Sequence, residues 1–143
     1  MNTRLLFYIL FITSLFTLAS CACDAPTMVS NTWVLEKYGP KNALTPVLDP
    51  APAPGSGVIT LSFDGTNVNG SDGCNNYFGS YTQSDCDLSV GNLNTTLIAC
   101  SPGIMSQASA YTTILRAVTT FRTKTNQLKL CTDDGRLLIF KKQ

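Results

Sequence analysis

The chain has 143 residues, of which 44% are hydrophobic and 13% are charged, and its formal net charge is +1. This length suits one domain with a core of ordinary size, and a charge near zero argues against nucleic acid as a partner. The sequence contains no histidine, which excludes Ser-His-Asp and Cys-His catalysis, imidazole zinc sites and a histidine general base. We therefore expect a protein that is not an enzyme and that uses no metal or other cofactor.

Residues 1–20 have the pattern of a bacterial lipoprotein signal peptide. Arg4 supplies the positive charge, an apolar run follows it, and Leu18-Ala19-Ser20-Cys21 ends the segment. The apolar run is short for a membrane span, and the two small residues fit a peptidase site. An ordinary secretory signal or a short membrane anchor is the alternative interpretation.

Cleavage before Cys21 would leave this cysteine at the N-terminus for lipidation. Two or more acyl chains there would anchor the protein stably, whereas a single chain binds reversibly. Because Ala22 rather than Asp follows the cysteine, we expect outer-membrane sorting, with the domain facing the periplasm. The predicted partners are thus the membrane, through the lipid, and an envelope protein.

We expect residues 21–31 to form a tether and residues 32–143 to form the domain. The first strand is predicted over 32–38, because this segment is rich in β-branched and aromatic residues and is followed by Gly39-Pro40. The proline-rich segment from Pro46 to Gly57 cannot form a helix or a central strand, so it is predicted to be a surface loop. It is either a stiff connection or a recognition arm.

Short strands dominate the rest of the domain. Asp64-Gly65 and Asp134-Gly135 are typical of hairpin turns. The seven remaining strands are predicted over 58–63, 66–70, 77–83, 88–90, 121–125, 128–131 and 136–140.

One helix is predicted after Ser101, which can cap it, with Pro102 in its first turn. Apolar residues then recur at spacings of four and three, which places them on one helix face directed at the core. The predicted packing residues are Trp33, Ala108, Tyr111, Leu115, Leu130 and Phe140.

The charges are unevenly distributed along the sequence. Residues 21–88 carry two bases and seven acids, whereas residues 89–143 carry seven bases and two acids. Because strand pairing brings distant segments together, we expect the two groups of charges to intermix.

Asp72, Asn75 and Asn76 form the most suggestive polar cluster, because carboxylate and amide oxygens can bind Ca²⁺. They lack the ladder of acidic residues that a calcium loop has, so a turn capped by its own side chains is favoured over a metal site. The adjacent acids Asp133 and Asp134 are assigned to a hairpin turn rather than to acid and base chemistry.

Three ordered segments resemble the META domain family. Gly73-Cys74-Asn75-Asn76-Tyr77-Phe78-Gly79-Ser80-Tyr81 is similar to the central motif of the family, and Thr95 to Pro102 is similar to its entry into the helix. Leu128 to Phe140 resembles its closing hairpin. Leu97 and Ala108 depart from the family pattern and are candidate surface contacts.

The resemblance implies an α+β, mainly β fold: a compact antiparallel sheet or partial barrel with one packed helix. It implies no established enzymatic activity and an association with envelope stress. Four cysteines of the domain make two bridges by number, since an exported protein meets an oxidising compartment. The family motif positions imply Cys74 with Cys100, and Cys86 is then expected to pair with Cys131.

A non-enzymatic, lipid-anchored envelope protein of this type, similar to the HslJ-like exported proteins, is thus the predicted function. The alternative is a lipoprotein inhibitor of a lysozyme or protease.

Overall fold

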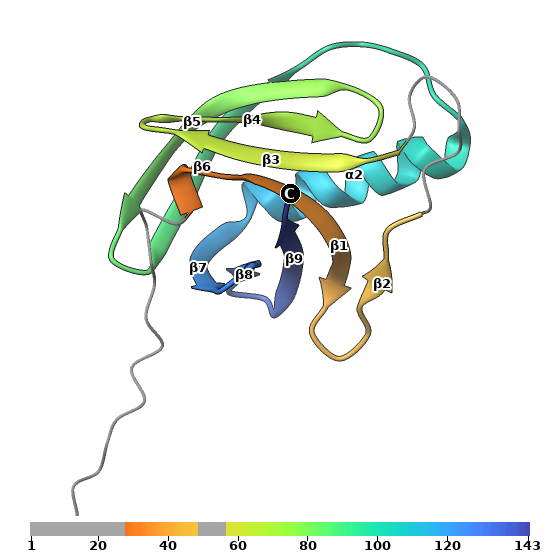
Figure 1. The fold of residues 1–143 in the computed structure, drawn as a ribbon. Helices are drawn as coiled ribbons and strands as arrows, with labels where there is room; N and C mark the ends of the chain where they lie inside the picture. The colour runs from red at the N-terminus through yellow and green to blue at the C-terminus, as the bar shows by residue number, and fades with distance from the viewer. Residues whose placement is uncertain (1–27, 49–56) are drawn as a thin grey trace, which may run out of the picture.

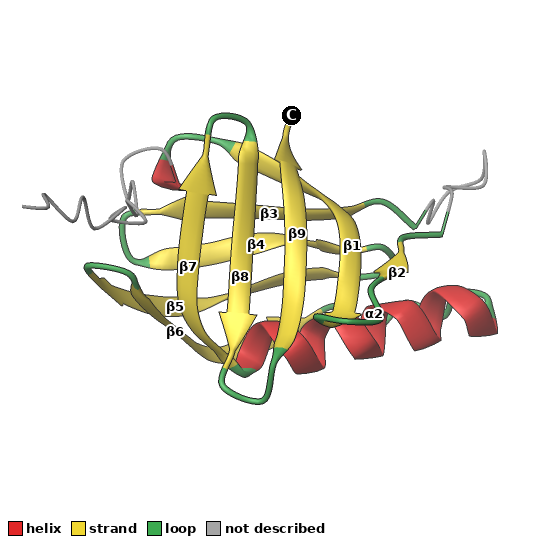
Figure 2. Cartoon of the chain, turned by 90° about the horizontal axis from the view of Figure 1, so that it is seen from below, coloured by secondary structure: helices red, strands yellow, loops and turns green. Residues whose placement is uncertain are grey.

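The computed structural model describes residues 28–48 and 57–143. They form antiparallel strands and one long helix (Figures 1 and 2). The elements are β1 (Thr32–Pro40), β2 (Thr45–Pro46), β3 (Ile59–Asp64), β4 (Asn67–Asp72), β5 (Asn76–Ser84), β6 (Asp87–Thr95), α2 (Pro102–Arg116), β7 (Val118–Lys124), β8 (Gln127–Thr132) and β9 (Arg136–Lys142). The predicted signal peptide, Cys21 and most of the tether and proline-rich loop lie outside the described residues.

Eight strands close into a barrel. Each strand from β3 to β9 pairs with the next one in the chain, and β1 pairs with both β3 and β9. The short β2 pairs with the last part of β1 as an antiparallel neighbour. Closure pairs most strand edges, which is how antiparallel sheets avoid aggregation, while β6 and β7 meet at one register pair, Asp87 with Thr120. The expected mainly β fold with one packed helix is confirmed.

The predicted hairpins are present at both Asp-Gly pairs. Gly65 has φ +59° and Gly135 has φ +82°, a region in which a side chain would be strained. The β5–β6 and β7–β8 turns instead place Asp85 and Thr125 at positive φ. Strand β6 runs well past the predicted end at residue 90, because pairing with β5 carries glycine and asparagine residues into the sheet.

Helix α2 begins where the sequence predicts. Ser101 has an extended backbone and precedes Pro102, but its hydroxyl forms no capping hydrogen bond, so this part of the prediction is wrong. Pro102 lacks an N–H that would have had no partner in the first turn, which suits it to this position. The main-chain N–H of Met105 donates to the carbonyl oxygen of Ser101 at 3.0 Å.

The core fills the barrel and the interface with α2. All six predicted packing residues are buried, and Ile114, Val118 and Phe121 join them. Figure 2 shows α2 crossing below one end of the barrel. Met28 is fully buried and accepts a 3.0 Å hydrogen bond from the Trp33 indole N–H, which fixes the start of the described chain against the barrel.

Candidate functional site

The segment between β4 and β5 is a turn held by its own polar side chains. Asp72 is buried, and its Oδ1 accepts hydrogen bonds from the main-chain N–H groups of Cys74 (2.9 Å) and Asn75 (2.6 Å). The N–H of Asp72 donates to the carbonyl oxygen of Asn75 at 2.8 Å. A carboxylate used in this way stabilises a turn.

Asn75 joins this turn to the loop that precedes α2. Its Oδ1 accepts hydrogen bonds from the N–H of Ile98 at 2.7 Å and from the hydroxyl of Thr96 at 2.9 Å. Asn76 is exposed, and its main-chain N–H donates to Thr96 Oγ1 at 3.1 Å. Within residues 28–48 and 57–143, no three His, Cys, Asp or Glu side chains are placed to hold a metal ion.

A disulfide bond ties the same turn to α2. Cys74 pairs with Cys100, as the family motifs imply, with their Cα atoms 6.0 Å apart. The Cys74 sulfur lies 3.6 Å from the sulfur of Met105 on the first turns of the helix. The turn, the loop and the helix start are therefore one connected unit.

The expected bridge between Cys86 and Cys131 is wrong. Cys131 is free, whereas Cys86 is disulfide-bonded. Phe121 of β7 donates its N–H to the Cys86 carbonyl oxygen at 2.9 Å, while the other edge of β7 pairs with β8, where Cys131 lies. Two strand spacings separate the cysteines by about 10 Å, beyond the Cα separation of about 4.4–6.8 Å that a disulfide spans.

Gln107 holds both ends of the proline-rich segment. Its side chain is buried; its Oε1 accepts a hydrogen bond from the N–H of Leu48 at 2.7 Å, and its Nε2 donates to the Gly57 carbonyl oxygen at 3.3 Å. The N–H of Gly57 in turn donates to the Gly73 carbonyl oxygen at 3.0 Å. A Cβ at Gly73, where φ is +93°, would lie 2.9 Å from the Gly57 oxygen, so only glycine fits this approach.

Sequence reasoning missed Gln107. The available signal was a single amide on the apolar face of α2, one residue before Ala108. Its two partners are far away in the chain, so the pairing could not be predicted. The structure therefore joins the proline-rich segment and the 70–76 turn at one place, the N-terminal end of α2.

Exposed apolar side chains gather at this place. Leu97 is 97% exposed, Ile98 56%, Leu48 48% and Met105 43%. A Cβ on Gly103 would lie 3.7 Å from Leu48 Cδ1, which places Leu48 beside the first turn of α2. We call these four residues the helix-end surface. Leu97 is thus at the surface, whereas Ala108, the other candidate surface contact, is buried.

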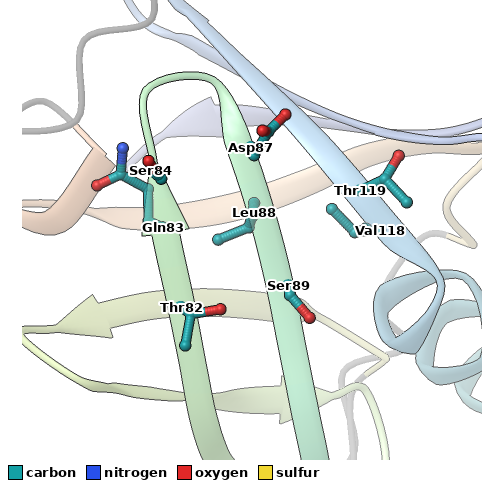
Figure 3. Close-up of a pocket in the computed structure, with 8 residues that line it drawn as sticks. All are labelled: Thr82, Gln83, Ser84, Asp87, Leu88, Ser89, Val118 and Thr119. Carbon is teal, nitrogen blue, oxygen red and sulfur yellow. The ribbon is translucent and has the colours of Figure 1, made fainter.

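A shallow hollow lies where β6 meets β7. These strands share one register pair, Asp87 with Thr120. Farther along β6, the guanidinium of Arg116, at the end of α2, donates a hydrogen bond to the Leu93 carbonyl oxygen at 3.3 Å. The hollow has a volume of about 280 Å³. Figure 3 shows its lining of Thr82, Gln83, Ser84, Asp87, Leu88, Ser89, Val118 and Thr119. Asp87 is the one ionisable side chain of this lining, whose other polar members are serine and threonine hydroxyls and the Gln83 amide.

Two buried tyrosines meet in the core. The Tyr77 and Tyr111 hydroxyl oxygens are 2.6 Å apart, and Tyr77 also donates to the Thr60 carbonyl oxygen at 2.8 Å. Burial raises the pKa of both phenols above their ordinary value. A phenol that stays protonated and has its partners in the core has a structural role.

The two adjacent acids of the last hairpin diverge, as expected. Asp134 forms an ion pair with Arg136 at 2.7 Å, and hydrogen bonds from Arg136 and then from Thr132 lower its pKa to about 2. Asp133 instead accepts a hydrogen bond from the hydroxyl of Thr119 at 2.7 Å. The pair is a turn and not an acid and base site.

Similar solved structures share this fold. An NMR structure of a protein from Burkholderia xenovorans is 28% identical, with a TM-score of 0.67 over 82% of this chain and 85% of that one. A second NMR structure is 23% identical, with a TM-score of 0.59 over 81% and 92% of the two chains.

The crystal structure of a DUF4847 family protein from Bacteroides vulgatus ATCC 8482 is 12% identical, with a TM-score of 0.59 over 81% and 94%. No curated protein matches the chain. The family model described as META domain matches residues 26–143, which includes every element of the barrel and α2. The chain belongs to the META domain family.

Proposed function

We propose that the protein is a lipid-anchored protein of the bacterial cell envelope that acts by binding a protein partner through the helix-end surface. The observation that carries the proposal is the nearly complete exposure of Leu97, beside Ile98 and Met105, on a loop fixed by a disulfide. Exposed apolar side chains gathered on a rigid support are typical of interaction sites.

The rigidity of this surface favours binding. Asn75 holds the loop at Ile98, the Cys74–Cys100 bridge holds it to the turn, and Gln107 holds the ends of the proline-rich segment. A surface that is already ordered loses little conformational entropy when a partner binds.

The chemistry of the described residues supports binding rather than catalysis. The META domain family is not a known enzyme family. The groups whose pKa is shifted are buried or hydrogen-bonded tyrosines and the Asp134–Arg136 pair, all of which have structural partners. The lipid anchor in the proposal depends on the sequence pattern that ends at Cys21.

No helix among the described residues is long and apolar enough to cross a bilayer. The anchor is tested directly at Cys21. In Cys21→Ala we expect the acyl mass of the processed protein to be lost and signal-peptide cleavage to be blocked. Normal processing of the variant, with normal retention in the membrane fraction, would contradict the lipid anchor.

Photo-crosslinking in intact cells tests the surface. A photoreactive residue at position 97 or 105 should capture one defined envelope protein, whereas the same residue at Thr82 or Asn94, which are also exposed but lie on β5 and β6, should not. Leu97→Ser combined with Ile98→Ser should reduce capture from position 105 by about tenfold, because hot-spot side chains carry most of the binding energy.

Equal capture from the β5 and β6 positions would contradict the proposed surface. Inhibition of a lysozyme or a protease by the purified protein would replace the envelope role with the inhibitor alternative. The same Leu97 and Ile98 substitutions would then show whether the helix-end surface makes the inhibitory contact.

A further inference from the structure

The outer face of β7, β8, β9 and β1 carries a row of basic side chains. Arg122 pairs in register with Lys129, and Ile139 lies between Lys129 and Lys37. In the next outward row, Lys124 pairs with Gln127, and Gln127 pairs with Lys141. The alternate residues of these strands, such as Phe121, Leu128, Leu130 and Phe140, are buried in the core. We call Lys37, Arg122, Lys124, Lys129 and Lys141 the basic face.

These cations lack local neutralisation. Within the described part of the chain, the ion pair of the structure joins Arg136 to Asp134, at the end of β9 away from Lys141. Glu36, at the bulge of β1, is the acidic side chain on the strands of this face. Five bases against one acid give the face a net positive charge.

The rest of the described barrel has no such cluster of basic side chains. Residues 88–115, which include most of β6 and nearly all of α2, contain no Asp, Glu, Lys or Arg. Exposed acids lie at the β3–β4 turn (Asp64) and the β5–β6 turn (Asp85 and Asp87). The expectation that the charges intermix is therefore wrong, because β7, β8 and β9 are neighbours in the sheet and keep their cations together.

The basic face reaches the end of the barrel at which the N-terminal segment enters. Thr32 accepts a hydrogen bond from the N–H of Gln143 at 3.0 Å, and Trp33 pairs in register with Lys142. Lys124 and Lys141 lie at this same end, beside the β7–β8 turn and the chain terminus. Figure 2 shows the four strands of the basic face side by side, and Figure 1 shows the first described residues, in orange, far from the N-terminal end of α2.

Cys21 precedes Met28 by seven residues, and an extended chain spans at most about 3.3–3.6 Å per residue, or roughly 25 Å here. A lipid attached at Cys21 would keep this end of the barrel close to the membrane. This step rests on the proposed anchor.

We propose that the basic face is a docking surface for the anionic headgroups of a phospholipid bilayer. With this face on the bilayer, residues 88–115 bring no charge to the membrane, and Asp87, whose register partner Thr120 lies two residues from Arg122, is an acid at the edge of the face. A basic residue near an anionic membrane raises binding by about fivefold, an effect that fades within a Debye length of roughly 8–10 Å. Docking would hold the barrel on its side and leave the helix-end surface free for a partner.

Lysine footprinting on vesicles tests the proposal. The processed protein, purified from membranes with its acyl mass checked, is mixed with neutral phosphatidylcholine vesicles or with vesicles that contain about 30% phosphatidylglycerol. A water-soluble acylating reagent and peptide mass spectrometry then measure the labelling rate of each lysine. Lys41, which is exposed beyond the far end of β1, is the internal control.

On the anionic vesicles, we expect the labelling of Lys124, Lys129 and Lys141 to fall by about fivefold or more, with Lys41 unchanged. Raising the salt from about 0.1 M to about 0.5 M should restore the labelling. Equal labelling on neutral and anionic vesicles would overturn the proposal. Protection by a soluble acidic polysaccharide, without protection on vesicles, would also overturn it and assign the face to a polymer.

Two variants with the same change in net charge distinguish an effect of the basic face from an effect of the net charge of the whole protein. The first combines Arg122→Gln, Lys124→Gln, Lys129→Gln and Lys141→Gln. The second adds four acids to the exposed side of β5 and β6 with Thr82→Glu, Ser89→Asp, Asn92→Asp and Asn94→Asp.

Lys37 should lose its protection in the first variant and keep it in the second. If Lys37 lost its protection equally in both variants, net charge alone would explain the protection, and the proposal would be overturned. Absence of the acyl mass would contradict the anchor alone, because docking is still read from protein added to vesicles.

Discussion

At the scale of single residues, the two buried tyrosines have unequal roles. Because the one hydroxyl proton of Tyr77 goes to the Thr60 carbonyl, Tyr111 must donate to Tyr77. Tyr77→Phe leaves a buried donor and a carbonyl without their partner, and we expect a loss of about 1–3 kcal/mol. Tyr111→Phe removes one donor and should cost about 1 kcal/mol. Urea unfolding measures both, and equal losses would contradict the assigned direction.

The last hairpin predicts a change of stability with acid. The pKa of Asp134 is lowered from 3.8 to about 2, chiefly by hydrogen bonds from Arg136. Because the folded value lies below the unfolded one, this stabilisation is present above pH 3.8 and is lost as the pH falls through about 2. Asp134→Asn should therefore weaken the decline of the unfolding free energy between these pH values. An unchanged decline would contradict a contribution from this exposed pair.

The cysteines support a prediction about the N-terminal segment. Cys74 and Cys100 are paired, Cys131 is free and Cys86 is disulfide-bonded, and the two other cysteines of the sequence are Cys21 and Cys23. If Cys21 is lipidated as proposed, a non-reducing peptide map should join Cys86 to Cys23. A link between Cys86 and Cys21 would contradict both this pairing and the anchor.

At the scale of elements, Gln107 links α2 to the two ends of the proline-rich segment. Gln107→Met keeps the volume but leaves the Leu48 N–H and the Gly57 carbonyl without the amide, so we expect a loss of about 1–3 kcal/mol. Ser106→Ala, at the exposed neighbouring position, should change the unfolding free energy by less than about 0.5 kcal/mol. Similar effects of the two substitutions in urea unfolding would show that the amide contributes little.

Local sequence was enough to predict those elements that are specified by a few neighbouring residues. Both Asp-Gly hairpins and the start of α2 at Pro102 are present as expected. The extension of β6 to Thr95 was missed, since pairing with β5 and not propensity holds its glycine and asparagines in the sheet. The Gln107 contacts and the Cys86 bond join residues far apart in sequence, and no local pattern predicts them.

At the scale of the whole molecule, strand order determines where the charges lie. The sequence shows that seven of the nine bases in 21–143 follow residue 88, but only the adjacency of β7, β8, β9 and β1 gathers four of them, with Lys37, on one face. The family resemblance implied the fold but did not predict that the basic side chains lie on one face. Similarly, nothing in the sequence indicates that the 70–76 turn and the proline-rich segment meet, and the contacts of Gly57 with Gly73 and Gln107 bring them together.

Because α2 contacts strands from both sides of the barrel, the helix and the barrel should unfold together. Leu115 is fully buried at this interface, so Leu115→Ala should cost about 2–5 kcal/mol. Trp33 is the single tryptophan and lies at the start of β1 in the barrel. Its fluorescence and the far-ultraviolet circular dichroism should show the same urea midpoint in the wild type, and the same lowered midpoint in the variant.

Thr113→Ala, at an exposed position on the same helix, is the matched control and should leave the midpoint nearly unchanged. A variant whose dichroism shifts while its Trp33 transition does not would mean that α2 detaches while the barrel stays folded. The helix-end surface would then depend on a separately folding element. Partner capture would be lost at urea concentrations lower than those that unfold the barrel.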